Sequence, residues 1–262
     1  MSGSEDIFLR DIIASEEEKE ESENNSIEDQ LYHVPDLEPV ANAVATTAPV
    51  CSIAAPRQVS SPGTCRDVNT VQWPGRNGFQ ILFPPPPITR TTRTTEYSAE
   101  LNKLYVVMDK WVEVRVVFKE DPPGSTFIRA MPVFAEATDS AIPVKRCPHH
   151  AQPEDVSNNG FPFPQHLIRF DTADAVYCED LESGRLSVIA PYSASILVKF
   201  LCLGSCAGGL ARRPLLVVFT AEEGRDTVLG REVVRVRVCS CPGRDRRSEE
   251  ARVERQREGE HR

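Results

Sequence analysis

From Val71 onward the chain reads as a series of short apolar or alternating segments, separated by clusters of Pro, Gly, Asn and Asp. Alternation of apolar and polar residues is the pattern of a strand with one buried face. Such segments occur at 103–108, 111–118, 127–135, 186–190, 196–201, 214–220 and 227–238. No helical pattern comes between them, so the sequence predicts an all-β sandwich.

A different pattern follows Pro242, a residue that suits the first position of a helix. Residues 244–254 are rich in helix formers and carry charges of both signs, with almost no apolar stripe. Core burial alone cannot hold such a helix. We therefore expect a C-terminal helix that is either simply solvated or presents its basic first turn to DNA.

Charge divides the chain into two parts. Residues 1–40 hold 13 acids and two bases, so the other 222 residues hold 39 − 13 = 26 acids and 30 − 2 = 28 bases. A strongly acidic region therefore precedes a mildly basic body, although the net charge of the whole chain is −9. We expect a disordered acidic region at 1–65, a domain at 66–254 and a disordered tail at 255–262.

One apolar island stands out in the acidic region. Phe8, Ile12 and Ile13 fall on one face of a helix, the anchor spacing of short segments that fold into a partner's groove. The alternative is an acidic tail without function. Acidic regions with such apolar residues are typical of activation segments.

The sequence predicts neither secretion nor membrane insertion. Ser4-Glu5-Asp6 is acidic where a signal peptide is positively charged, and the longest apolar runs have the length of a strand. The eight cysteines are therefore expected to be thiols or metal ligands, in a cytosolic or nuclear protein.

Cysteine and histidine gather in two distant runs. Cys147 and His150 form one pair and Cys202 and Cys206 the other, which together make four ligands for a structural zinc ion that joins two loops. The alternative is ordinary buried cysteines beside an incidental His pair, and His149 competes as a ligand. A site closed by four protein ligands leaves no position for catalytic water, so we expect no enzyme.

Arginines follow the second pair of ligands. Arg212 and Arg213 come directly after it, and the pairing suggests that one points outward and the other braces the loop. Arg235 and Arg237 alternate with valines, which places both arginines on one strand face. Arg244 falls in the first turn of the expected helix, where Asp245 could orient a neighbouring guanidinium. The alternative for each arginine is a solvated surface.

Taken together, these runs resemble the DNA-binding domain of the p53 tumour-suppressor transcription factors. The resemblance covers about 73–250 and is carried in one order by YSAELNKL (97–104), PPGSTFIRAM (122–131), VKRCPHH (144–150), PQHLIRF (164–170), CLGSCAGGLARRPLL (202–216) and LGREVVRVRVCSCPGRDRRSEE (229–250). It implies an immunoglobulin-like β-sandwich with zinc-braced loops, a loop–sheet–helix DNA surface and a C-terminal helix.

The resemblance also implies roles for single residues. One Zn²⁺ per chain would be held by Cys147, His150, Cys202 and Cys206. Arg212 would enter the minor groove, Arg237 and Ser205 would contact phosphate, and Arg244 and Cys241 would reach base edges, with further DNA contacts from Ser240 and Arg247. Arg146 and Arg213 would brace loops, and Asp245 would orient the contact arginines.

The implied function is a nuclear, sequence-specific transcription factor with a cytoplasmic pool, which regulates stress response, cell-cycle arrest and apoptosis. Its partners would be double-stranded DNA, other copies of itself on DNA, and coactivators or a ubiquitin ligase at Phe8, Ile12 and Ile13. The alternative is a truncated interaction form that modulates full-length relatives without strong DNA binding of its own.

Two features depart from the family's pattern. The first DNA-facing loop of the family carries a Lys, whereas Thr91 lies near that place, with Arg90 and Arg93 beside it. Nothing after Glu250 resembles the tetramerisation helix or the basic tail of the family. We therefore expect a C-terminally truncated form that binds single half-sites weakly.

Overall fold

The computed structural model describes residues 68–85, 93–224 and 227–260. The chain divides into two units, Met1–Ser52 and Ile53–Arg262, and every described residue belongs to the second unit. Its elements in chain order are β1 Gln80–Leu82, β2 Thr95–Ser98, β3 Lys103–Val106, β4 Val112–Val117, β5 Thr126–Phe134, β6 Ile168–Phe170, β7 Val176–Glu179, β8 Leu186–Pro191, β9 Ser195–Phe200, β10 Leu215–Glu223, β11 Thr227–Val238 and α2 Pro242–Glu260.

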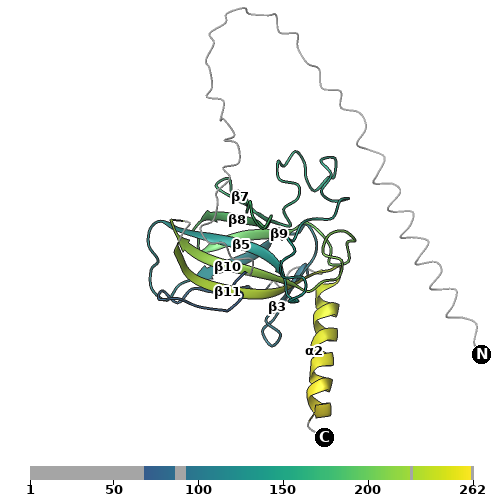
Figure 1. Ribbon diagram of the computed structural model, residues 1–262. Helices are drawn as coiled ribbons and strands as arrows, with labels where there is room; N and C mark the ends of the chain where they lie inside the picture. The colour runs from purple at the N-terminus through teal and green to yellow at the C-terminus, as the bar shows by residue number, and fades with distance from the viewer. Residues whose placement is uncertain (1–67, 86–92, 225–226, 261–262) are drawn as a thin grey trace, which may run out of the picture. The chain divides into compact units, whose positions relative to one another are not determined.

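The strands of the described residues form two sheets (Figure 1). The four-stranded sheet has the order β1-β4-β9-β6, and the seven-stranded sheet has the order β2-β3-β11-β10-β5-β8-β7. Among these pairings only β3 with β11 is parallel. The two sheets share one hydrophobic core, so the predicted β-sandwich is confirmed.

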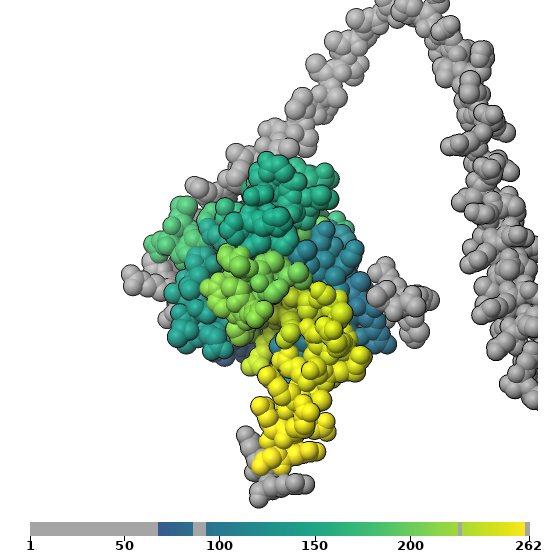
Figure 2. Space-filling model, turned by 90° about the vertical axis from the view of Figure 1, so that its right-hand side faces the viewer, coloured from purple at the N-terminus to yellow at the C-terminus, as the bar shows by residue number. Residues whose placement is uncertain are grey.

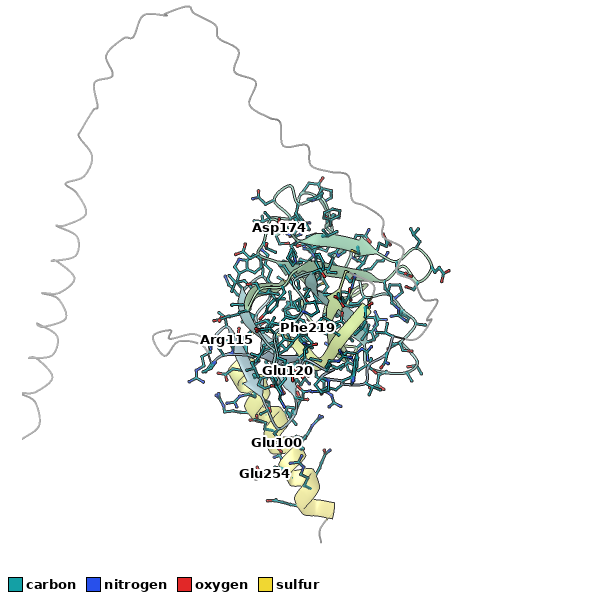
Figure 3. The ribbon with its side chains drawn as sticks, turned by 90° about the vertical axis from the view of Figure 1, so that its left-hand side faces the viewer. Glu100, Arg115, Glu120, Asp174, Phe219 and Glu254 are labelled. Atoms are coloured by element: carbon teal, nitrogen blue, oxygen red, sulfur yellow. The ribbon has the colours of Figure 1, made fainter. Side chains whose placement is uncertain are left out.

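Alternating valines build that core from both sides. In β4, Val112, Val114 and Val116 are buried, while Arg115 between them is exposed. In β11, the buried valines at 234, 236 and 238 alternate with exposed arginines at 235 and 237. Figure 3 shows Phe219 of β10 in the interior between the sheets and Arg115 at the periphery. The alternation thus places the arginines of β11 on the outer face of the larger sheet.

Four strands were not among the predicted segments: β1, β2, β6 and β7. Each has three or four residues, which is too short to show an alternation that differs from chance. Their pairing partners fix them instead, as β6 shows by pairing with β9 over Ile168–Phe170.

Ion pairs attach the C-terminal helix α2 to the sandwich. Glu249 accepts a hydrogen bond of 2.6 Å from Lys103 of β3, Arg246 lies 3.4 Å from Glu96 of β2, and Arg257 pairs with Glu100. The helix continues through 255–260, so the expected disordered tail is wrong for those residues. Their Glu, Arg and Gln favour helix, and the Arg257 ion pair fastens this turn to the domain.

Candidate functional site

Four side chains from two loops converge at one end of the sandwich. Cys147 and His150 lie between β5 and β6, and Cys202 and Cys206 lie between β9 and β10. His150 Nδ1 is 3.3 Å from Cys147 Sγ and 3.6 Å from the Sγ atoms of both Cys202 and Cys206. All four candidate ligand atoms lie within 4.8 Å of one another, so the cluster could hold a metal ion.

His149 does not join these four side chains. It is exposed, and it forms a second group with Asp155 that also requires His150. The Nδ1 atom of His150, however, faces the three sulfurs. The structure therefore brings together the ligand set that the sequence predicts and leaves the competing histidine outside it.

A pair of glycines lets the two loops approach each other. Gly208 has a φ of 72°, in the left-handed region that favours glycine, and a Cβ there would lie 2.9 Å from Pro148. A Cβ on Gly209 would lie 2.8 Å from the backbone nitrogen of Cys147. Both glycines are therefore needed for the close packing of the 202–213 loop on the first ligand pair.

Arg146 braces the first loop from inside. Its fully buried side chain donates to the carbonyl oxygens of Leu201 at 3.0 Å and Pro164 at 2.9 Å, and to Ser157 Oγ at 2.6 Å. It also donates to the side-chain oxygen of Asn158. These bonds tie the loop of Cys147 and His150 to the end of β9, so Arg146 lies where a bracing residue would and is not exposed for DNA.

Asn158 and Arg169 complete this brace, and neither was predicted from the sequence. Asn158 donates to the backbone oxygens of His150 at 3.0 Å and Gln152 at 2.6 Å, and accepts from Arg169 at 2.7 Å. Burial and the nearby charge of Arg146 lower the pKa of Arg169 to about 10. An Asn beside a buried Arg carries no distinctive sequence signal, because its partners in the β5–β6 loop and in β6 come together only in the fold.

The two arginines after the second ligand pair differ in their contacts. Arg213 donates to the carbonyl oxygens of Leu210 at 3.3 Å and Gly209 at 2.7 Å, and its guanidinium lies 3.8 Å from the ring centroid of Phe134. Arg212 is exposed, with a φ of 64°. The loop thus uses one arginine to stabilise itself and presents the other to solvent.

A short backbone contact joins this loop to the larger sheet. The amide of Gly204 donates to the carbonyl oxygen of Val238 at 2.9 Å. The amide of Arg212 donates to the carbonyl oxygen of Gly204 at 2.6 Å. Exposed Ser205 lies next to this contact in the chain. Figure 2 shows the light-green segment around 200–215 beside the yellow first turns of α2. The 202–213 loop, the end of β11 and the start of α2 therefore form one continuous surface.

Asp245 links two arginines on this surface. Its carboxylate lies 3.1 Å from Nε of Arg237 on β11 and 3.5 Å from Nε of Arg244 in the first turn of α2. Both arginine side chains are more than half exposed, whereas the side chain of Asp245 is 15% exposed. One partly buried acid thus lies beside two outward-facing cations.

Ser240, Cys241 and Arg247 are also exposed around the junction of β11 and α2. The predicted partner-binding residues Phe8, Ile12 and Ile13 lie outside the described residues, as do Arg90 and Thr91. Arg93 is described and pairs with Glu96 at 3.0 Å. No helix among the described residues has the length and apolarity to cross a bilayer.

Comparison with known proteins agrees with this architecture. The family model of the P53 DNA-binding domain matches residues 69–253. The chain is 37% identical to "Cellular tumor antigen p53" of Oncorhynchus mykiss over 76% of the chain and 52% of that protein. It is 35% identical to the Xenopus laevis protein of the same name, over 85% of the chain and 62% of that protein. For the Xiphophorus hellerii protein, also of that name, the identity is 40% over 69% of the chain and 54% of that protein.

The chain thus spans between 52% and 62% of the length of these three relatives. The family match covers the whole sandwich, both ligand pairs and most of α2, which are the parts that build the surface described above. The chain therefore belongs to the P53 DNA-binding domain family.

Proposed function

We propose that this chain is a sequence-specific DNA-binding transcription factor that acts in the nucleus. The observation that carries the proposal is the placement of Arg237 and Arg244 side by side, both held by Asp245 on an exposed surface. Arginines fixed before binding lose less conformational freedom on DNA, so Arg244 can read a base edge while Arg237 positions the domain on a phosphate. Family membership supports the same function, and we propose no enzymatic activity.

We propose that one Zn²⁺ per chain is bound by Cys147, His150, Cys202 and Cys206. A tetrahedral zinc with Zn–S of about 2.3 Å and Zn–N of about 2.0 Å places sulfur and nitrogen ligands about 3.6 Å apart. The observed separations of 3.3 and 3.6 Å fit this arrangement. Burial raises the pKa of Cys202 to about 12, so a neighbouring dication is needed to keep this thiol deprotonated. Bound zinc would supply structural cross-linking of the two loops.

The proposed DNA contacts follow the surface from loop to helix. Arg212 would enter the minor groove, where a guanidinium is favoured by the negative potential. Arg237 and Ser205 would contact phosphates, and Arg244 and Cys241 would reach base edges in the major groove. Ser240 and Arg247, which are exposed beside them, would add contacts. Arg146 and Arg213 would act only through the loops that they brace.

Other partners are proposed from the family and from the N-terminal sequence. We expect copies of the chain to associate on DNA, which would raise the avidity for paired half-sites. The segment with Phe8, Ile12 and Ile13 would bind a coactivator or a ubiquitin ligase by a helix-in-groove mode. A cytoplasmic pool would exist beside the nuclear one.

A salt titration of binding to a selected duplex and to a random duplex tests the proposed function. We expect the selected duplex to bind more tightly at every salt concentration. Arg237→Ala should weaken both duplexes alike and reduce the slope of log K against log salt by about one unit. Arg235→Ala is the matched control, because Arg235 is an exposed arginine on the same face of β11. Equal affinity for the two duplexes would exclude specific recognition.

A further inference from the structure

Behind Arg237 lies a small network that the proposed DNA contacts do not include. In the parallel pairing of β3 with β11, Tyr105 is the register partner of Arg237, and Lys103 is the partner of Arg235. Register partners on neighbouring strands project to the same face of a sheet. Arg237 is exposed on that face, whereas Tyr105 is fully buried. Glu249 of α2 lies close to both Tyr105 and Arg237.

One oxygen of Glu249 has three donor groups near it and accepts hydrogen bonds from two of them. Its Oε2 accepts a hydrogen bond of 2.9 Å from Lys103 Nζ and another of 2.9 Å from the hydroxyl of Tyr105. Nη1 of Arg237 lies 4.0 Å from the same oxygen, which is beyond hydrogen-bonding distance. A carboxylate oxygen has two lone-pair sites, so Lys103 and Tyr105 together saturate Oε2.

The hydroxyl of Tyr105 is well suited to remain a donor. Burial and its hydrogen bond to Glu249 raise the pKa of Tyr105, so the group stays protonated at neutral pH. If the hydroxyl were absent, Oε2 would have one free lone-pair site, and the nearest remaining cation would be Arg237. The guanidinium of Arg237 would then pair with both Asp245 and Glu249. Fewer of its N–H donors would remain available to a phosphate.

We propose that Tyr105 is a positioning residue for DNA binding, whose hydroxyl holds Glu249 and so keeps the outer guanidinium nitrogen of Arg237 available to a phosphate. The inference rests on the proposed phosphate contact of Arg237. Tyr105 touches neither DNA nor Arg237 through a hydrogen bond, so it acts only through the carboxylate of Glu249.

Tyr105→Phe tests the role of the hydroxyl, because phenylalanine keeps the buried ring. We expect the affinity for the selected and the random duplex to fall together by about threefold to tenfold, the range of one lost hydrogen bond. The salt slope should fall toward that of Arg237→Ala. Circular dichroism and the thermal midpoint would check that the fold is kept. This check is needed because a loss of packing around the ring could also weaken DNA binding.

A second variant separates positioning from stability. In the Tyr105→Phe/Glu249→Gln double variant, the glutamine cannot form an ion pair with Arg237, so the salt slope should return to that of the unchanged chain. A slope that does not recover would show that Tyr105 acts through general packing, and would overturn the inference. The single variant Glu249→Gln should keep the normal slope whether or not Tyr105→Phe folds, and a reduced slope there would also overturn it.

The Arg237→Ala variant distinguishes this inference from the proposed function. If Arg237→Ala lowers the salt slope and Tyr105→Phe leaves it unchanged, the positioning role is wrong while the phosphate contact stands. If Arg237→Ala itself leaves the slope unchanged, the phosphate contact is wrong, and the inference falls with it.

Discussion

At the scale of single residues, the arginines of this domain have different tasks that their sequence neighbours partly reveal. Arg212 and Arg213 are adjacent, yet one is exposed and the other donates to two carbonyl oxygens and covers Phe134. Arg146, by contrast, has four acceptors that come from distant positions in the chain. A doubled basic residue can thus be interpreted locally, whereas a buried bracing arginine becomes evident only from the fold.

Arg244 is the residue for which we expect a change in base preference. Arg244→Ala should lower the affinity for the selected duplex by about 1–3 kcal/mol and relax the choice at one base pair, because it removes one bidentate base contact. Competition binding with duplexes altered at single positions measures both effects. Arg252→Ala, which removes an exposed arginine farther along α2, is the control and should change neither. An unchanged base preference in Arg244→Ala would contradict the base contact.

At the scale of elements, the predictable parts of the fold are those with long patterns. β11 was predicted with its observed bounds because its valines alternate through to Val238, and β4 was predicted within one residue at each end. The short strands β1, β2, β6 and β7 carry no such pattern, and their existence follows from the neighbours that they pair with. Helix α2 was predicted from its composition, but its attachment by Lys103, Glu96 and Glu100 depends on tertiary contacts that no local pattern contains.

The candidate site shows the same division. The spacing within 147–150 and 202–206 suggested two half-sites, and the structure brings the four ligand atoms together. Asn158, Tyr105 and Glu249 were not predicted, because their hydrogen-bond partners lie elsewhere in the chain. The hydroxyl of Tyr105, for example, contacts a residue 144 positions away.

The loop that carries Arg212 depends on close packing at Gly209. Gly209→Ala would place a Cβ 2.8 Å from the nitrogen and 3.0 Å from the Cβ of Cys147, so the two loops must move apart. We expect a loss of about 1–3 kcal/mol in unfolding free energy, the usual cost of overpacking, together with faster loss of zinc. Chemical denaturation and zinc content after dialysis measure these effects. Gly124→Ala, where a Cβ meets nothing within 4 Å, should leave zinc content unchanged.

At the scale of the whole molecule, a buried histidine makes stability depend on pH. Burial, assisted by the charges of Arg169 and Lys145, lowers the pKa of His166 from 6.5 to about 4. Between these values the unfolded chain binds a proton that the folded domain does not. The unfolding free energy should therefore decrease as the pH falls from 6.5 to about 4, by an amount on the order of 3 kcal/mol.

Denaturation curves at several pH values test this dependence. His166→Phe keeps a ring beside Tyr177, whose ring centroid lies 5.1 Å from that of His166, and should remove this part of the pH dependence. If the variant loses stability over the same pH range as the unchanged chain, other groups must be responsible.

The backbone contact between Gly204 and Val238 has a consequence for how the domain responds to its two proposed ligands. The 202–213 loop supplies two of the four candidate metal ligands and also presents Arg212 beside the end of β11. Metal and DNA are then thermodynamically linked: whatever factor zinc contributes to the affinity for DNA, DNA must contribute to the affinity for zinc. The DNA-bound protein should therefore hold its metal more tightly than the DNA-free protein. A chelator should remove metal first from the molecules that are not bound to DNA.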